Sequence, residues 1–225
     1  MGRWGEGLFE GDHDLDEASY ISEDAGIELY HYEIDEKDPE SLGKGLAATR
    51  AHLNNGVLDR LFEQYSVKAN TDDENSWGNE KLRLVILAAL AMRVGATISS
   101  KYMDLLRTSY TQIHVSPKYS LPLADSNFRA PGKVQFETAL RLYKNDGTPY
   151  SFDVARCAAV GCGKAHDDLD DGKKLLRCGK CKVASYCGKE CQTAHWKEHK
   201  RVCKTPAQVE ADLRRSSGPY VMLNV

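Results

Sequence analysis

All seven cysteines of this 225-residue chain lie in one short segment, from Cys157 to Cys203, and none lies in the first 156 residues. A secreted disulfide framework favours an even number of cysteines and an export signal. Thiolate and neutral imidazole are the usual zinc ligands, and a two-residue spacer lets both sulfurs of a pair reach one ion. An odd, clustered set of cysteines with one well-placed histidine therefore predicts a metal site.

Eight side chains in this segment are suited to bind zinc. The expected ligands are Cys157, Cys162, Cys178, Cys181, Cys187, Cys191, His199 and Cys203. Eight such groups make two closed tetrahedra, and a closed site leaves no position for an activated water. We therefore expect two structural zinc ions and no catalytic one.

The same segment has too few large apolar side chains to fold on its own. Its larger apolar residues are Val160, Leu169, Leu175, Leu176, Val183, Tyr186, Trp196 and Val202. These side chains cannot bury enough surface for independent folding. Zinc binding contributes roughly 10–16 kcal/mol per site, which can fold such a segment.

The second half of the segment resembles a MYND-type zinc finger. The resemblance rests on Tyr186-Cys187-x3-Cys191-Gln192-x3-Trp196-x2-His199-Lys200-x2-Cys203, which agrees with the family pattern at every spacing. It covers about 47 of the 225 residues, from 157 to 203. One departure is the first pair, where four residues separate Cys157 from Cys162 and the commonest family pattern has two. His166 is the alternative ligand at that pair.

The resemblance also implies how the ligands divide between the two ions. It places Cys157, Cys162, Cys187 and Cys191 on one zinc, and Cys178, Cys181, His199 and Cys203 on the other. Helix geometry agrees with this division. If Gly188–Lys200 is helical, His199 lies roughly 12 Å along the axis from Cys191, whereas ligands of one tetrahedron lie within about 4 Å. His195, one turn past Cys191, is the competing candidate for the first ion.

MYND fingers are protein-interaction modules that often recognise proline-rich peptides, and the resemblance implies Gln192 and Trp196 as contact residues. An exposed indole offers a flat apolar face and one N–H donor, which suits a polyproline II ligand. The alternative is that Trp196 packs inward and fills a small core. We expect a zinc-binding adaptor, a transcriptional or regulatory cofactor without enzymatic activity.

Two other functions are alternatives. Some MYND fingers are embedded in lysine methyltransferases, but residues 1–156 show no cofactor-binding or catalytic signature of that class. The second alternative is a DNA-binding transcription factor. Residues 157–203 carry ten Lys or Arg against six Asp or Glu. Seven thiolates around two Zn²⁺ add a net −3, which leaves the finger near +1, and its helix has no basic stripe with base-reading residues.

The rest of the chain predicts a mainly α fold with a small helical domain. Asp38-Pro39-Glu40 is a helix start, and Asn54-Asn55-Gly56 is a break in the helical pattern that follows. Glu80–Val94 is apolar nearly all round, which is typical of a central helix. A further helix around Phe136 is expected to end near Asp146.

We divide the chain into four parts on this basis. Thr71–Asn79 reads as a polar loop, and residues 115–132, with three prolines, as an irregular crossing. The parts are an acidic N-terminal segment (1–37), a helical domain of unknown function (38–150), the MYND-type finger with a short hairpin and a short helix (157–203), and a C-terminal tail (204–225).

Charge and hydropathy limit the partners and the cellular location that we expect for this chain. Residues 1–40 carry fourteen Asp or Glu against two Lys or Arg, a net charge of −12, which repels nucleic acid and anionic membrane. Met1–Glu10 lacks the basic and apolar regions of an export signal. The most apolar run, Leu84–Met92, is too short to span a bilayer. We expect an intracellular protein of the nucleus or the cytoplasm.

Overall fold

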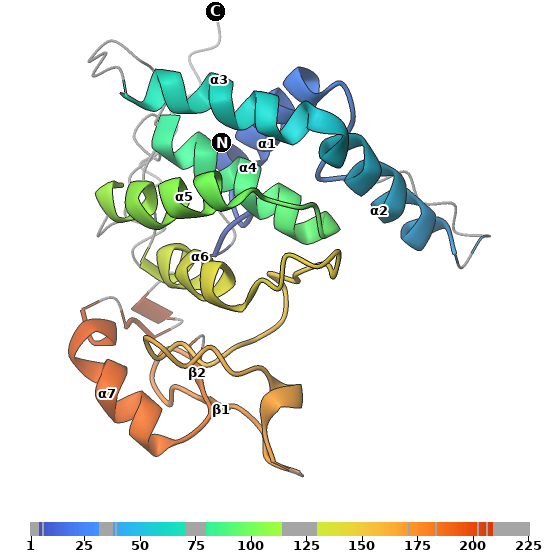
Figure 1. The fold of residues 1–225 in the computed structure, drawn as a ribbon. Coiled ribbons are helices and arrows are strands. Elements are labelled where there is room, and N and C mark those ends of the chain that lie inside the picture. The colour runs from blue at the N-terminus through green and yellow to red at the C-terminus, as the bar shows by residue number, and fades with distance from the viewer. Residues whose placement is uncertain are drawn as a thin grey trace, which may run out of the picture. The chain divides into compact units, whose positions relative to one another are not determined.

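The computed structural model describes residues 5, 7–31, 38, 40–70, 80–113, 130–170, 172–182, 184–201, 203–205 and 207–208. These residues form two compact units, one up to Asp153 and one from Val154 onward. The first unit is helical, and the second contains two short strands and one α-helix (Figure 1). All seven cysteines lie in the second unit. The predicted loop at 71–79, most of the predicted crossing at 115–132 and most of the tail lie outside the described residues.

The described part of the first unit is helical, as its apolar periodicity predicts. Its α-helices are α1 (Asp12–Ala25), α2 (Ser41–His52), α3 (Leu58–Asn70), α4 (Glu80–Val94), α5 (Ser100–Gln112) and α6 (Ala130–Leu142). A kinked segment, Leu53–Val57, joins α2 to α3, and Asn55 and Gly56 take non-helical backbone angles within it. Among the described residues, every helix is too short or too polar to cross a lipid bilayer.

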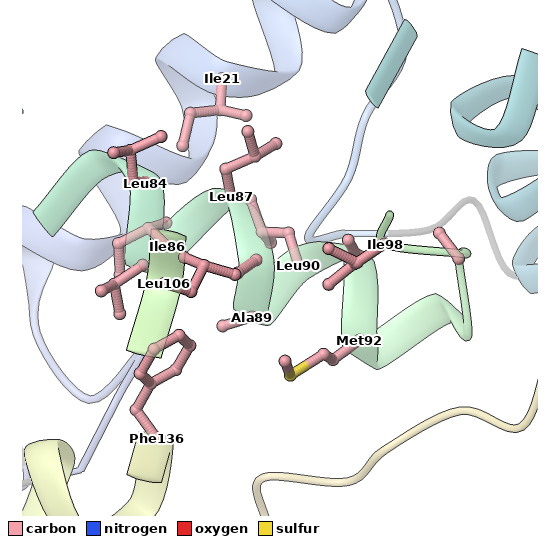
Figure 2. Packing of buried hydrophobic residues seen from close by; sticks show 14 of the residues in the cluster. Ile21, Leu84, Ile86, Leu87, Ala89, Leu90, Met92, Ile98, Leu106 and Phe136 are labelled. Atoms are coloured by element: carbon pink, nitrogen blue, oxygen red, sulfur yellow. The ribbon is translucent and has the colours of Figure 1, made fainter. Parts of the chain in front are cut away.

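Helix α4 is the centre of this unit. Every residue from Leu84 to Met92 is fully buried. The helix contacts α1, α2, α3, α5 and α6, and it runs between α3 and α5 in Figure 1. Figure 2 shows Ile21 of α1 and Phe136 of α6 among the side chains packed around it. A helix that is apolar on all faces is stable when other helices cover it on all sides. The prediction of a central helix is therefore confirmed.

The described part of the acidic segment packs on this core through its apolar residues. Ile21 and Leu29 are fully buried. The carboxylate of Glu17 is also buried, and the Arg83 Nε donates a hydrogen bond of 2.6 Å to its Oε2. A buried charge needs such a partner. Helix α1 therefore contributes to the core despite its acidic composition.

The helix expected from Asp38 begins at Ser41 instead. The Asp38 side chain accepts a hydrogen bond from the Glu40 N–H at 2.9 Å, and the Asp38 carbonyl accepts one from the Ser41 N–H at 2.9 Å. Asp38 thus closes a turn that precedes the helix. The predicted break is confirmed, because Gly56 takes a φ of 90° in the kinked segment between α2 and α3.

One end of the predicted irregular crossing is also helical. Helix α6 begins at Ala130, so Pro131 lies in its first turn and not in the crossing. The first turn of a helix tolerates proline because its N–H groups have no partner within the helix. In the sequence, Pro131 is therefore compatible both with an irregular crossing and with the first turn of a helix.

We predict that Leu87→Ala lowers the free energy of unfolding of the first unit by about 2–5 kcal/mol, because it leaves a cavity in a fully packed core. Leu87 is fully buried on α4, whereas Leu42 of α2 is 44% exposed. The matched control Leu42→Ala should change stability by less than about 1 kcal/mol. Denaturant unfolding followed by helical circular dichroism measures both changes, and equal effects would contradict the central position of α4.

Candidate metal centre

The second unit contains a short hairpin followed by a helix, as predicted. Its elements are a 3₁₀ turn (His166–Asp168), β1 (Leu176–Arg177), β2 (Ser185–Tyr186) and α7 (Lys189–His199). The two strands are antiparallel, with Leu176 opposite Tyr186 and Arg177 opposite Ser185. Gly188 precedes α7 in extended conformation and Lys200 follows it, which agrees with the helix expected over Gly188–Lys200.

Four cysteines form a first group of converging sulfur atoms. The group consists of Cys157, Cys162, Cys187 and Cys191, whose sulfurs lie within 4.8 Å of one another. The Cys187 Sγ lies 3.5 Å from the Cys162 Sγ and 3.3 Å from the Cys191 Sγ. Two sulfurs bound to one zinc at about 2.3 Å are separated by about 3.8 Å in a tetrahedron. The spacing of this group is therefore close to that of a zinc site.

The four-residue spacer of the first pair closes a tight loop. The Cys157 N–H donates to the Lys164 carbonyl at 2.8 Å, and the Cys162 N–H donates to the Ala159 carbonyl at 3.0 Å. Gly161 takes a φ of 77°, which a residue without Cβ adopts without strain. The longer spacer thus brings both sulfurs to the same point.

The second group is completely buried. It consists of Cys178, Cys181, His199 and Cys203, whose ligand atoms lie within 4.8 Å of one another. The Cys178 Sγ lies 3.7 Å from the Cys203 Sγ, and the Cys181 Sγ lies 3.5 Å from the His199 Nε2. The structure therefore brings together the same eight residues that the sequence indicates, in the division that the resemblance implies.

The loop between the strands holds the first two members of the second group. The Cys178 N–H donates to the Ala184 carbonyl at 2.8 Å, and the Lys182 N–H donates to the Cys178 carbonyl at 3.0 Å. Lys182 takes a left-handed φ of 62° at this turn. The two hydrogen bonds close the turn on one side of the hairpin, so that both sulfurs point to the same place.

The protonation of these groups is shifted by their surroundings. Burial, followed by the neighbouring Cys178 thiol, raises the pKa of Cys203 to about 11. Burial also opposes ionisation of Cys178, but hydrogen bonds from the Cys181 and Lys180 N–H groups outweigh it and lower the pKa. Burial lowers the pKa of His199, which favours the neutral imidazole that a metal requires. A dication offsets the repulsion between closely spaced thiolates.

The core of this unit consists mainly of the cysteines themselves. Its buried members are Cys157, Ala159, Cys178, Cys181, Tyr186 and Cys203. Tyr186 is the single large apolar side chain among these six. Soft sulfur donors at tetrahedral spacing, with one neutral imidazole, are the donor set of structural zinc. The two groups therefore fit two zinc ions. Bound zinc would supply the stabilisation that so few large apolar side chains cannot provide.

The two alternative histidines lie outside both groups. His166 is 60% exposed, and its Nδ1 lies 3.5 Å from the Asp167 carboxylate. His195 lies on α7, where its Nδ1 is 3.2 Å from the hydroxyl of the fully buried Tyr186. Sequence reasoning treated His195 as a competing ligand and missed this hydrogen bond. The signal in the sequence was Tyr186 itself, because a tyrosine buried in a segment with few large apolar side chains needs a hydrogen-bond partner for its hydroxyl.

The two residues implied as peptide contacts lie one turn apart on α7. Trp196 is 42% exposed, and its ring stands edge-on to His199 with 5.9 Å between centroids. Gln192 is half-buried. The Trp196 ring therefore contacts His199 and is also partly accessible to solvent. Its role as a peptide contact stays a prediction.

Comparison with known proteins agrees with this geometry. Residues 157–203 match the MYND finger family, and this segment is a MYND finger. The chain is 53% identical over 64 residues to the histone-lysine N-methyltransferase SMYD3 of Homo sapiens, which is 28% of this chain and 14% of that protein. A SET and MYND domain-containing protein of Dictyostelium discoideum is 48% identical over 58 residues, 25% of this chain and 11% of the relative.

A third relative is named for the finger alone. The MYND-type zinc finger protein samB of Emericella nidulans is 34% identical over 53 residues, 24% of this chain and 8% of its own length. This chain therefore spans less than a sixth of each of these relatives. No solved structure gives a significant match to the chain.

Proposed function

We propose that this chain is a non-enzymatic adaptor whose MYND finger binds a proline-rich segment of a partner protein through Gln192 and Trp196. The observation that carries the proposal is an accessible indole on a helix next to the second metal group. In this proposal the eight converging Cys and His side chains are the zinc ligands. Cysteines that serve as zinc ligands and not as disulfides are typical of the reducing interior of the cell, so the proposal places the chain in the nucleus or the cytoplasm.

Both metal groups include residues of α7 or its immediate flanks. Cys187 and Cys191 are in the first group, at the start of the helix, and His199 is in the second group, at its end. Two bound ions would therefore hold the helix at both ends. A surface that is rigid before binding loses little conformational entropy when the ligand docks. Trp196, between the two ends, is suited to act as an anchor.

Two observations support an adaptor over an enzyme. The relatives named as methyltransferases match this chain over the finger region and over 14% or less of their own length. Each metal group has four protein ligand atoms, which leaves no coordination position for substrate or activated water. The finger thus offers a surface for binding and no metal-based chemistry.

We predict that Trp196→Ala weakens binding of a proline-rich peptide by at least about thirtyfold, because an exposed aromatic anchor carries a large share of the affinity at such sites. The variant should keep its zinc. Fluorescence anisotropy with a labelled peptide measures the affinity, and elemental analysis measures the zinc content.

The matched control is Val160→Ala, which truncates another exposed apolar side chain of the same unit, 58% accessible, and should leave the affinity unchanged. Loss of zinc together with binding in Trp196→Ala would show that the indole acts as a core residue. Transfer of methyl groups from S-adenosylmethionine to histones by the purified chain would contradict the non-enzymatic part of the proposal.

A further inference from the structure

The exposed indole of Trp196 lies on a helix face that also carries two lysines. Lys189, Thr193, Trp196 and Lys200 follow one another at intervals of four, three and four residues, which places them on one side of α7. All four are exposed. Among the residues that the structure describes, no carboxylate forms an ion pair with Lys189 or Lys200. Both ammonium groups are therefore available to a ligand.

The acidic residues of the same helix lie on other faces. At about 100° per residue, Glu190 is roughly 120° and Glu198 roughly 160° from Trp196 around the axis. The charged side chains on this face of α7 are thus both positive, although the zinc-loaded finger is close to neutral overall. A positive local field with an apolar centre is complementary to an apolar residue flanked by negative charge.

Helix stability does not account for the charge at Lys189. This residue is the first of α7, where the partial positive charge of the helix N-terminus disfavours a cation. Lys200 follows the last helical residue, where a cation is favoured. The two lysines therefore differ in their effect on the helix, and they lie on opposite sides of Trp196 along the helix axis. A ligand with negative charge on both sides of its anchor would interact with both.

We propose that the partner segment is acidic as well as proline-rich, with carboxylates on both sides of the apolar residue that contacts Trp196. The inference rests on the proposed function of the same face. Along the axis, Lys189 lies about 10 Å and Lys200 about 6 Å from Trp196, at about 1.5 Å per residue. A polyproline II peptide rises about 3.1 Å per residue. In a peptide that lies along α7, acidic residues about two to three positions from the anchor on either side therefore reach the two lysines.

Three labelled peptides test the proposal on the zinc-loaded chain. All share a proline-rich centre with one leucine, and they differ in flanks of glutamate, serine or lysine. We expect the glutamate peptide to bind about five- to tenfold more tightly than the serine peptide, and the lysine peptide to bind more weakly. The advantage of the glutamate peptide should disappear at about 1 M salt, where screening acts over about 3 Å.

Lysine variants assign the effect to this face. Lys189→Gln combined with Lys200→Gln should bring the glutamate peptide to the affinity of the serine peptide and leave the serine peptide unchanged. The matched control is Lys197→Gln, which removes the same charge from an exposed position about 100° away on α7. Lys189→Glu combined with Lys200→Glu should reverse the preference, so that the lysine peptide binds best.

The outcomes separate this inference from the proposed function. Equal affinity for the three peptides, with binding still lost in Trp196→Ala, would overturn the acidic preference and leave the adaptor function intact. Failure of the zinc-loaded chain to bind any of the peptides would reject the adaptor function itself. Binding of duplex DNA that is lost in the lysine variants, with equal peptide affinities, would assign the face to nucleic acid and overturn the inference.

Discussion

Removal of zinc with an excess of a strong chelator is expected to unfold residues 157–203 and to leave the helices of the first unit folded. The buried core of the finger is made mainly of cysteines, and Tyr186 is its one large apolar member. Binding of structural zinc contributes roughly 10–16 kcal/mol per site, which is comparable to the whole stability of an ordinary domain, about 5–15 kcal/mol. Without the ions, that contribution is lost.

The first unit has an independent source of stability. Its core extends over six helices and includes the fully buried run from Leu84 to Met92. None of the predicted ligands lies in this unit. The helical signal in circular dichroism should therefore fall by little more than the share of α7, and amide protection should be lost within the finger alone.

The measurement begins with elemental analysis, which should give two zinc ions per chain before chelation. Addition of zinc to the chelated protein should restore amide protection in the finger. A stoichiometry of one or none would contradict the two-ion interpretation. A single cooperative loss of all helix on chelation would instead show that the two units do not fold separately.

The finger could be predicted closely from the sequence because metal ligands impose strict spacing. Cys187, Cys191, His199 and Cys203 lie within or next to one helix, so their relative positions follow from helix geometry alone. The first pair was harder to predict. Its loop depends on the left-handed φ of Gly161 and on the hydrogen bond between the Cys157 N–H and the Lys164 carbonyl, which spacing does not specify.

The helical unit could be predicted in outline and less well in detail. The apolar run of α4 specifies a central helix whatever surrounds it. The start of α2 is decided by one side chain, since Asp38 bonds the Glu40 N–H in a turn and the helix begins only at Ser41. An aspartate that caps a helix and one that closes a preceding turn have the same local sequence pattern. Helix boundaries are therefore less determined than helix existence.

The hydrogen bond between Tyr186 and His195 gives the sharpest test of the ligand assignment, because it separates the two histidines of α7. We expect His199→Ala to reduce the zinc content from two ions to one. We expect His195→Ala to retain both. The His199 Nε2 lies 3.5 Å from the Cys181 Sγ, whereas the His195 Nδ1 lies 3.2 Å from the Tyr186 hydroxyl.

The second substitution should nevertheless destabilise the finger. Burial, followed by the surrounding cysteines, raises the pKa of Tyr186 to about 12, so its hydroxyl stays protonated and needs an acceptor. Burial lowers the pKa of His195, which keeps the imidazole neutral and its Nδ1 able to accept. His195→Ala leaves a buried hydroxyl without this partner, which costs about 1–3 kcal/mol. Thermal unfolding of the zinc-loaded protein measures the loss.

A double variant distinguishes this hydrogen bond from a general packing effect. Adding Tyr186→Phe to His195→Ala removes the orphaned hydroxyl together with its partner, and replacement of both partners is close to neutral for a hydrogen bond. The double variant should therefore be more stable than His195→Ala alone, with two zinc ions bound in both. If His195→Ala loses an ion and His199→Ala does not, the ligand roles are reversed. If Tyr186→Phe further destabilises His195→Ala, the hydrogen bond is not the source of the effect.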